Sequence, residues 1–142
     1  MAWALKRFSL TKNVPLAISR GTTAAVVRLE LTVEQGGICG RGETGGFETG
    51  HRSYGTESVE QELQNLLPRL NTLDSLLPQR VEALLQALSP PARCAVDLAC
   101  WDWWGQHLGQ PLWNLWGLDG QQQVATSVTL GLGDVPAVLE RL

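Results

Sequence analysis

A stretch of small residues between positions 91 and 105 constrains the fold of this chain more than any other part of the sequence. Small side chains recur there at helical spacing, at Ala92, Ala95, Ala99 and Cys100. A helix with such a face can approach a neighbouring sheet closely, because only short side chains separate the two backbones. A turn is expected at Gly109-Gln110-Pro111, and the helical part of the chain is expected to stop at Gly117.

The first third of the chain has the pattern of an antiparallel meander. Three segments carry alternating or β-branched side chains: 2–10, 24–34 and 38–43. Gly36-Gly37, between the second and third segments, is a turn signal. We expect a polar loop over 11–22 and a mobile glycine-rich loop over 45–55.

From Ser58 onward the apolar period becomes helical. The first helix is predicted to begin with Ser58 and Gln61 as a capping box. A second helix is predicted over 78–88. The third has Ser89 as its N-cap and Pro90 at the first helical position, where a missing N–H costs nothing.

The end of the chain carries the pattern of one more strand and helix. Residues 125–130 alternate like a strand, and Asp134 is expected to cap a helix over 135–142. The predicted fold class is therefore α+β, a three-stranded antiparallel meander followed by a helical bundle.

Four short motifs stand in order along the chain: Ile18-Ser19-Arg20-Gly21-Thr22, Gly40-Arg41-Gly42-Glu43, Tyr54-Gly55-Thr56-Glu57-Ser58 and Thr126-Ser127-Val128-Thr129. With the small-residue helix, they resemble the N-terminal capping domain and barrel start of the enolase superfamily, in its mandelate racemase and muconate lactonizing branch. Dipeptide epimerases are the enzymes that they resemble most. The third motif departs from the more frequent YGET order of that family.

The resemblance implies a Mg²⁺-dependent isomerase that removes and returns a proton α to a carboxylate. In that family the capping domain leads into a TIM barrel of about 250 residues, which carries the catalytic lysines and the metal-ligating acids. The 142 residues cannot hold both parts. Residues 1–117 would form the capping domain, and 118–142 the first β/α unit of a truncated barrel.

The implied function is that of the N-terminal part of an L-Ala-D/L-Glu epimerase-like enzyme, inactive as this fragment. Two alternatives stay open. The chain could come from a muconate cycloisomerase or an o-succinylbenzoate synthase within the same superfamily. It could also be a stand-alone binding or structural module that is not an enzyme. A barrel encoded in frame after Leu142 would show that the chain is a fragment rather than a stand-alone module.

The resemblance also implies two substrate-binding residues. Arg20 would meet the carboxylate of a small anionic dipeptide, since a guanidinium group binds carboxylate in bidentate fashion. Thr129 would line the substrate pocket. No catalytic residue is assigned, because Lys6 and Lys12 are the only lysines and form no K-x-K pair. No metal ligand is assigned either, because in the family the three metal-ligating acids lie on the barrel. Mg²⁺ is therefore expected in the full-length family and not on this chain alone.

The remaining polar residues are interpreted as structural. We expect structural roles for Glu43, Asp97 and Asp102, with Asp97 or Asp102 pairing with Arg93 or capping nearby backbone groups. The histidines, His51 and His107, have no second ligand at metal spacing. Trp101, Trp104 and Trp116 are expected to supply core between helix and sheet. The glycine-rich segment 45–50 lacks the lysine of a phosphate-binding loop.

Composition limits the partners. A net charge of −3 gives no basic footprint for nucleic acid, and no apolar run reaches the ~20 residues of a membrane span. The three cysteines (Cys39, Cys94 and Cys100) form no CxxC pair, so we expect them to be reduced and buried in a cytoplasmic protein. Apolar surface left open by the missing barrel predicts a homo-oligomer.

Overall fold

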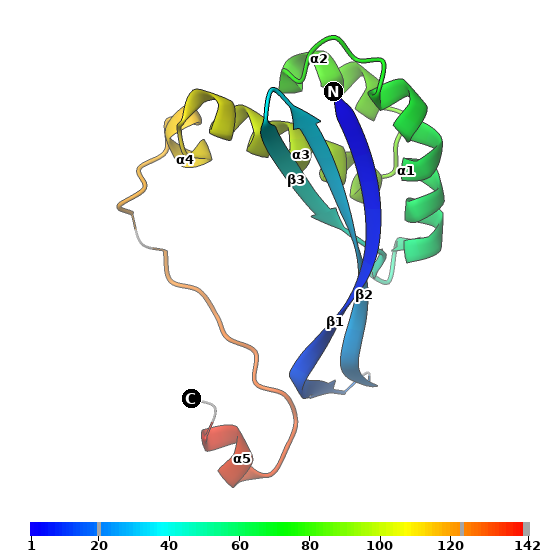
Figure 1. Cartoon of the computed structure of the whole chain (residues 1–142). Helices are drawn as coiled ribbons and strands as arrows, with labels where there is room; N and C mark the ends of the chain where they lie inside the picture. Colours follow the sequence, from blue (N-terminus) through cyan, green and yellow to red (C-terminus); the bar gives the residue numbers. More distant parts are fainter. Residues whose placement is uncertain (20, 123, 141–142) are drawn as a thin grey trace.

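The centre of the computed structural model, which describes residues 1–19, 21–122 and 124–140, is a three-stranded antiparallel sheet in the order β1-β2-β3 (Figure 1). The strands are β1 (Ala2–Ile18), β2 (Gly21–Gln35) and β3 (Ile38–Thr44). Gly36 and Gly37 make the β2–β3 turn with φ of 61° and 77°, in the left-handed region that favours glycine. The predicted meander is confirmed.

Helices follow the sheet, as the α+β prediction requires. They are α1 (Thr56–Leu70), α2 (Pro78–Leu85), α3 (Pro90–Leu108), α4 (Leu112–Leu115) and α5 (Val135–Leu139). The first and third helices cover one face of the sheet, α1 along β1 and α3 along β3 (Figure 1). No helix in the described part of the chain is long and apolar enough to cross a membrane.

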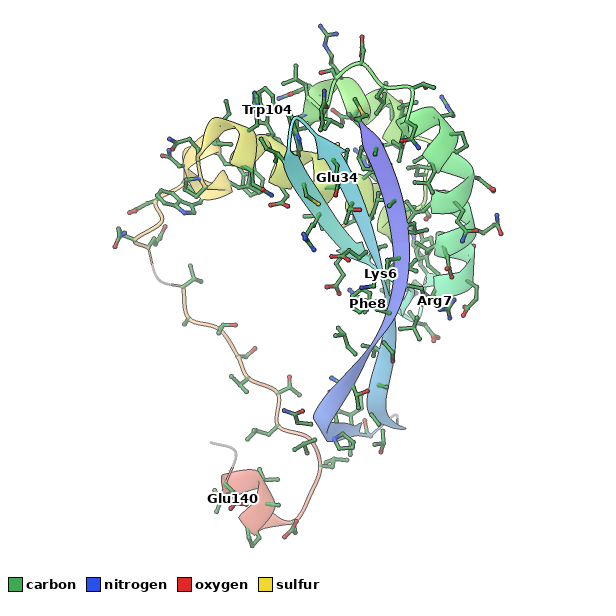
Figure 2. The ribbon with its side chains drawn as sticks, viewed as in Figure 1. Lys6, Arg7, Phe8, Glu34, Trp104 and Glu140 are labelled. Carbon is green, nitrogen blue, oxygen red and sulfur yellow. The ribbon has the colours of Figure 1, made fainter. Side chains whose placement is uncertain are left out.

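The core lies between this face of the sheet and the helices. Alternate residues of β2, Leu29, Leu31 and Val33, have no exposed area, as expected for a strand with one buried face. The helices supply the other buried side chains, among them Val59, Leu63, Leu70, Val81, Leu85, Val96 and Cys100. Arg7 points from β1 towards α1, where it forms ion pairs with Glu57 at 2.8 Å and Glu60 at 2.7 Å (Figure 2).

The small-residue face of α3 packs directly on two glycines of β3. A Cβ atom built on Gly42 would lie 2.0 Å from the carbonyl oxygen of Ala95, and one built on Gly40 would lie 2.2 Å from that of Ala99. Such distances are impossible for a real Cβ atom, so both positions require glycine. The small residues of α3 and the two glycines of β3 are two halves of one close contact.

Two predicted loops are in fact paired strands, so the expectation of loops was wrong. In place of the loop over 11–22, β1 continues to Ile18 and pairs with β2 down to Gly21, after a register shift between Thr11 and Leu16. Polarity suggested a loop, but backbone pairing does not require apolar side chains. The glycine-rich loop likewise contains a small hairpin of β4 (Phe47–Glu48) and β5 (Ser53–Tyr54).

The helix boundaries differ in two places. Helix α1 begins at Thr56 with Gly55 as its N-cap, so the capping box of Ser58 and Gln61 is wrong. The Thr56 hydroxyl accepts a hydrogen bond from the Gly46 N–H at 3.0 Å, which fixes the start of the helix against the preceding loop. Helix α2 ends at Leu85 rather than at residue 88. The N-cap at Ser89 is confirmed.

The predicted strand over 125–130 is not formed: residues 124–130 adopt neither helix nor strand. A strand requires a neighbour for its backbone groups, and no described strand runs beside this segment. The chain crosses this region as an extended segment between α4 and α5 (Figure 1). Asp134 is the N-cap of α5, as expected.

Burial corrects two further expectations. Only Cys100 is buried among the cysteines, since Cys39 is half-buried and Cys94 is exposed. Burial raises the pKa of the Cys100 thiol to about 12. Among the tryptophans, Trp3 and Trp103 belong to the core. Trp116, expected in the core, is 51% exposed and stacks edge-on against Trp101 at 5.5 Å.

Candidate functional site

The hairpin tip, residues 16–23 where β1 turns into β2, is the first part of the candidate site. It extends well beyond α1 and α3 (Figure 1). Gly21 has a φ of 144°, a conformation that L side chains rarely adopt, and it pairs with Ile18 across the turn. Arg20, the predicted carboxylate-binding residue, lies outside the described residues.

A cavity of about 540 Å³ lies beside the tip, and we call it the tip cavity. Its lining residues come from the tip and from the small hairpin of β4 and β5: Ile18, Gly21, Thr22, Thr23, Glu48 and Gly50. Two segments separated by about 25 positions in sequence therefore meet around one polar hollow. A small ligand with hydrogen-bonding groups suits such a lining.

Glu48 is a site residue that the sequence analysis missed. It stands on β4, which pairs with β5 through Phe47–Tyr54 and Glu48–Ser53. The rings of Phe47 and Tyr54 lie 5.0 Å apart, which supports this pairing. In the sequence, Glu48 is an acidic residue in a segment with the composition of a loop, and nothing there indicates that it lies beside the tip.

Thr129, the second predicted substrate-binding residue, lies in the extended segment 124–130 and is exposed. It is not among the residues that line the tip cavity. The segment nevertheless reaches the tip two residues later, where Gly131 approaches Ala17 and Leu16. The structure therefore brings the neighbourhoods of the two predicted residues together without placing Thr129 in the cavity.

Within residues 1–19, 21–122 and 124–140, the structure brings together no group of three His, Cys, Asp or Glu side chains that could hold a metal ion. The described residues therefore do not fit a Mg²⁺ site of the usual carboxylate type.

Glu43 and Asp102 have structural partners. The Glu43 carboxylate forms an ion pair with Arg28 at 2.7 Å. Asp102 accepts a hydrogen bond from the Arg41 N–H at 2.8 Å, which links α3 to β3.

Neither histidine belongs to a cluster of possible metal ligands among the described residues. His107, in the last turn of α3, stacks on Trp103 with ring centres 4.7 Å apart and an interplanar angle of 11°. His51 is exposed in the turn between β4 and β5. Both side chains therefore lie at the protein surface.

A cleft of about 500 Å³ separates α2 from α3. It is lined in part by Glu82, Arg93, Cys94, Asp97 and Trp101. Partial burial raises the pKa of Asp97 above its ordinary value; the positive charge of Arg93 opposes this shift and the negative charge of Glu82 adds to it. Arg93 forms its ion pair with Glu82, at 3.5 Å, so the expected pairing of Arg93 with Asp97 or Asp102 is wrong.

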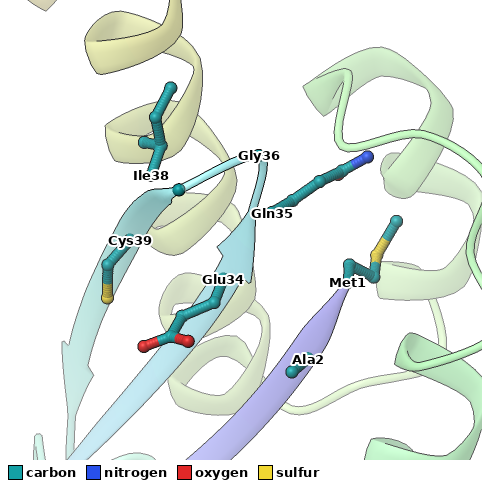
Figure 3. Close-up of a pocket in the computed structure, with 8 residues that line it drawn as sticks. Met1, Ala2, Glu34, Gln35, Gly36, Ile38 and Cys39 are labelled. Atoms are coloured by element: carbon teal, nitrogen blue, oxygen red, sulfur yellow. The ribbon is translucent and has the colours of Figure 1, made fainter.

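A further cavity of about 560 Å³ lies at the other end of the sheet, where β1 begins and β2 turns into β3 (Figure 3). Met1, Glu34, Gln35 and Cys39 contribute to its lining. Because β2 runs from the tip to this turn, the cavity is separated from the tip by the full length of the strand.

The sequence of residues 4–117 matches the family model of the mandelate racemase / muconate lactonizing enzyme N-terminal domain. An L-Ala-D/L-Glu epimerase of Bacteroides thetaiotaomicron is 33% identical over 83% of this chain and 30% of its own length. A hydrophobic dipeptide epimerase of Enterococcus faecalis is 30% identical over 94% of this chain and 37% of its own length. The chain thus spans well under half of these curated relatives.

Solved structures agree with this fold. A dipeptide epimerase from Cytophaga hutchinsonii, crystallised with Mg and the dipeptide D-Ala-L-Val, superposes with a TM-score of 0.78 over 98% of this chain and 39% of its own, at 22% identity. At that identity the likeness concerns the fold alone. The domain match over residues 4–117 identifies this chain as a member of the mandelate racemase / muconate lactonizing enzyme family, carrying the N-terminal capping domain of the enolase superfamily.

Proposed function

We propose that this chain is the substrate-recognising, N-terminal part of a dipeptide epimerase of the L-Ala-D/L-Glu type. The observation that carries the proposal is the similarity to dipeptide epimerases, at 30% identity over 94% of the chain and at 33% identity over 83% of it. Residues 1–117 form the capping domain in this proposal, and 118–142 begin the barrel. The polar tip cavity supports a small ligand with charged ends.

The role of this chain is to bind and orient the dipeptide. Arg20 binds the carboxylate, because its planar guanidinium group matches the two carboxylate oxygens. Thr129 contacts the substrate from the barrel side. Mg²⁺ would stabilise the charge that develops when the α-proton leaves, and its ligands, like the proton-transferring bases, come from outside these 142 residues.

The decisive experiment is a fusion protein. Residues 1–142 are joined to the part of the Bacteroides thetaiotaomicron L-Ala-D/L-Glu epimerase that lies beyond its match with this chain. Exchange of the α-proton of L-Ala-L-Glu is followed by NMR in D₂O with Mg²⁺. We expect the fusion protein to catalyse exchange and the 142-residue chain alone to be inactive, since removing groups that act as a unit eliminates nearly all of the rate.

Arg20→Ala in the fusion protein is expected to raise KM roughly 10- to 100-fold, the effect of losing a charged hydrogen bond. Arg80→Ala, an exposed change on α2, is the matched control and should leave KM unchanged. A folded fusion protein that exchanges no dipeptide would refute the proposed function. Mg²⁺-dependent exchange by the 142-residue chain alone, lost in Arg20→Ala, would show that the catalytic groups are here after all.

A further inference from the structure

The hairpin tip is held by a later part of the same chain. The Leu132 N–H donates a hydrogen bond to the Ala17 carbonyl oxygen at 2.7 Å, in a contact that no sheet or helix includes. Figure 1 shows the segment after α4 returning to this end of the hairpin. The tip is therefore tied to the C-terminal segment through backbone atoms.

Gly131 makes this hydrogen bond possible. The residue is buried, and a Cβ atom built on it would lie 3.2 Å from the Ala17 oxygen, 3.3 Å from the Ala17 nitrogen and 3.3 Å from Cδ1 of Leu16. A single methyl group would press on the neighbouring backbone, and a branched side chain would separate the two segments. Gly133, two positions later, has only Cγ2 of Val138 nearby at 3.6 Å, which is ordinary contact.

The contact joins the two segments that carry the proposed substrate-binding residues. Arg20 follows Ala17 by three positions, and Thr129 precedes Gly131 by two. The outer hairpin has little other support, since Leu10 and Val14 are 46% and 53% exposed. The distance between the two binding residues therefore depends on how firmly Gly131 and Leu132 hold Ala17.

We propose that Gly131 and the hydrogen bond from Leu132 to Ala17 form a clamp that sets the position of the hairpin tip relative to residues 126–129. Gly131 is thus a positioning residue for substrate recognition. The clamp itself rests on backbone geometry, and its role towards substrate rests on the proposed function. When the clamp is broken, the residues of the tip are still present but are no longer aligned with Thr129. We expect the dipeptide to bind more weakly, while the rate of proton transfer in the bound state stays the same.

The first test measures the clamp without any activity. Amide hydrogen exchange is followed by NMR in the 142-residue chain, in Gly131→Val and in the matched control Gly133→Val. We expect Gly131→Val to speed exchange at Leu132 roughly fivefold, as for one lost backbone hydrogen bond, with the core amides of Leu29 and Leu31 unchanged. Equal exchange at Leu132 in the wild-type chain and in Gly131→Val would overturn the clamp.

The second test uses the fusion protein described above. Gly131→Val is expected to raise KM for L-Ala-L-Glu about tenfold while kcat stays within about twofold, because misplacement of a binding group costs affinity. Gly133→Val should change neither. An unchanged KM would overturn the positioning role. If the unaltered fusion protein is inactive, the proposed function and the substrate role of Gly131 both fail, and the exchange measurement alone decides the clamp.

Discussion

Gly40 and Gly42 control the approach of α3 to the sheet, because any side chain at either position would overlap a carbonyl oxygen of the helix. The Gly40-Arg41-Gly42-Glu43 motif was recognisable from its letters, and the structure supplies its cause in the backbone of α3. Glu48 was not recognisable, because its role depends on a partner segment about 25 positions away. Residue identity predicts a close contact when both sides are small, and it does not predict which loop faces which.

Gly42→Ala is expected to lower the free energy of unfolding by about 3 kcal/mol, the upper end of the usual cost of overpacking. The new Cβ atom would lie 2.0 Å from the Ala95 carbonyl oxygen, so α3 must move away from β3. Urea unfolding followed by circular dichroism measures the change. Gly133→Ala is the control, because its Cβ would meet only Cγ2 of Val138, at the ordinary contact distance of 3.6 Å; similar losses in both variants would contradict the close-contact account.

Asp97→Asn is expected to raise the free energy of unfolding at pH 7 by up to about 1 kcal/mol, a small effect because the group is partly screened by solvent. Since burial raises the pKa of Asp97, the folded state binds the proton more tightly than the unfolded state. The resulting contribution to stability is present at low pH and is lost as the pH rises through the raised pKa.

The gain from Asp97→Asn should therefore shrink as the pH falls through the raised pKa of the folded protein, and it should vanish below about 4, the ordinary pKa of the unfolded carboxyl group. Urea unfolding at several pH values measures this, with Asp74→Asn, an exposed change, as the control. A gain that grows on acidification would show that burial does not dominate at Asp97.

At the scale of elements, the periodicity of the sequence predicted the strands and helices that bury a face. The strand over 24–34 could be located from its β-branched and aliphatic side chains, and the helix that begins at Pro90 from its small residues at helical spacing. The outer part of the β1–β2 hairpin could not be located in this way. Both of its faces are exposed, and polar and apolar residues do not alternate along it. The prediction of a strand over 125–130 is wrong for the opposite reason: the segment has a strand pattern, but no described strand lies beside it.

Glu62→Ala is expected to destabilise the contact between α1 and the start of α3 by about 1–2 kcal/mol. The Glu62 carboxylate accepts hydrogen bonds from the Ser89 N–H, at 2.8 Å, and from the Ser89 hydroxyl. One helix thus provides the acceptor for the N-cap residue of another. Chemical unfolding measures the loss.

Two further variants separate this contact from helix propensity. Glu62→Gln keeps an acceptor and should cost less than Glu62→Ala. Gln64→Ala, an exposed change on the same helix, should cost almost nothing. Equal effects of Glu62→Ala and Gln64→Ala would argue against the link to Ser89.

The whole molecule exposes apolar side chains after the capping domain. Val124 and Val128 are both 80% exposed, and Leu132 is 71% exposed. Such surface drives association. We expect the 142-residue chain to self-associate and to bind a hydrophobic dye in sedimentation velocity and fluorescence measurements.

Val124→Asp combined with Val128→Asp should reduce both association and dye binding. Thr126→Asp combined with Thr129→Asp adds the same charge to the same segment at polar positions and serves as the control. A compact monomer of the unaltered chain that binds no dye would refute the prediction.

The unequal lengths of sheet and helices have a mechanical consequence. From Arg7, the last residue of β1 that contacts a helix through an ion pair, to Ile18 the arm measures about 36 Å at 3.3 Å per residue. A bend of about 5° at the root would displace the end of such an arm by about 3 Å, unless the hydrogen bond from Leu132 to Ala17 held it in place. Substitutions in the arm that touch no ligand can therefore alter which ligands fit, and preference can drift during evolution while the residues facing the ligand stay the same.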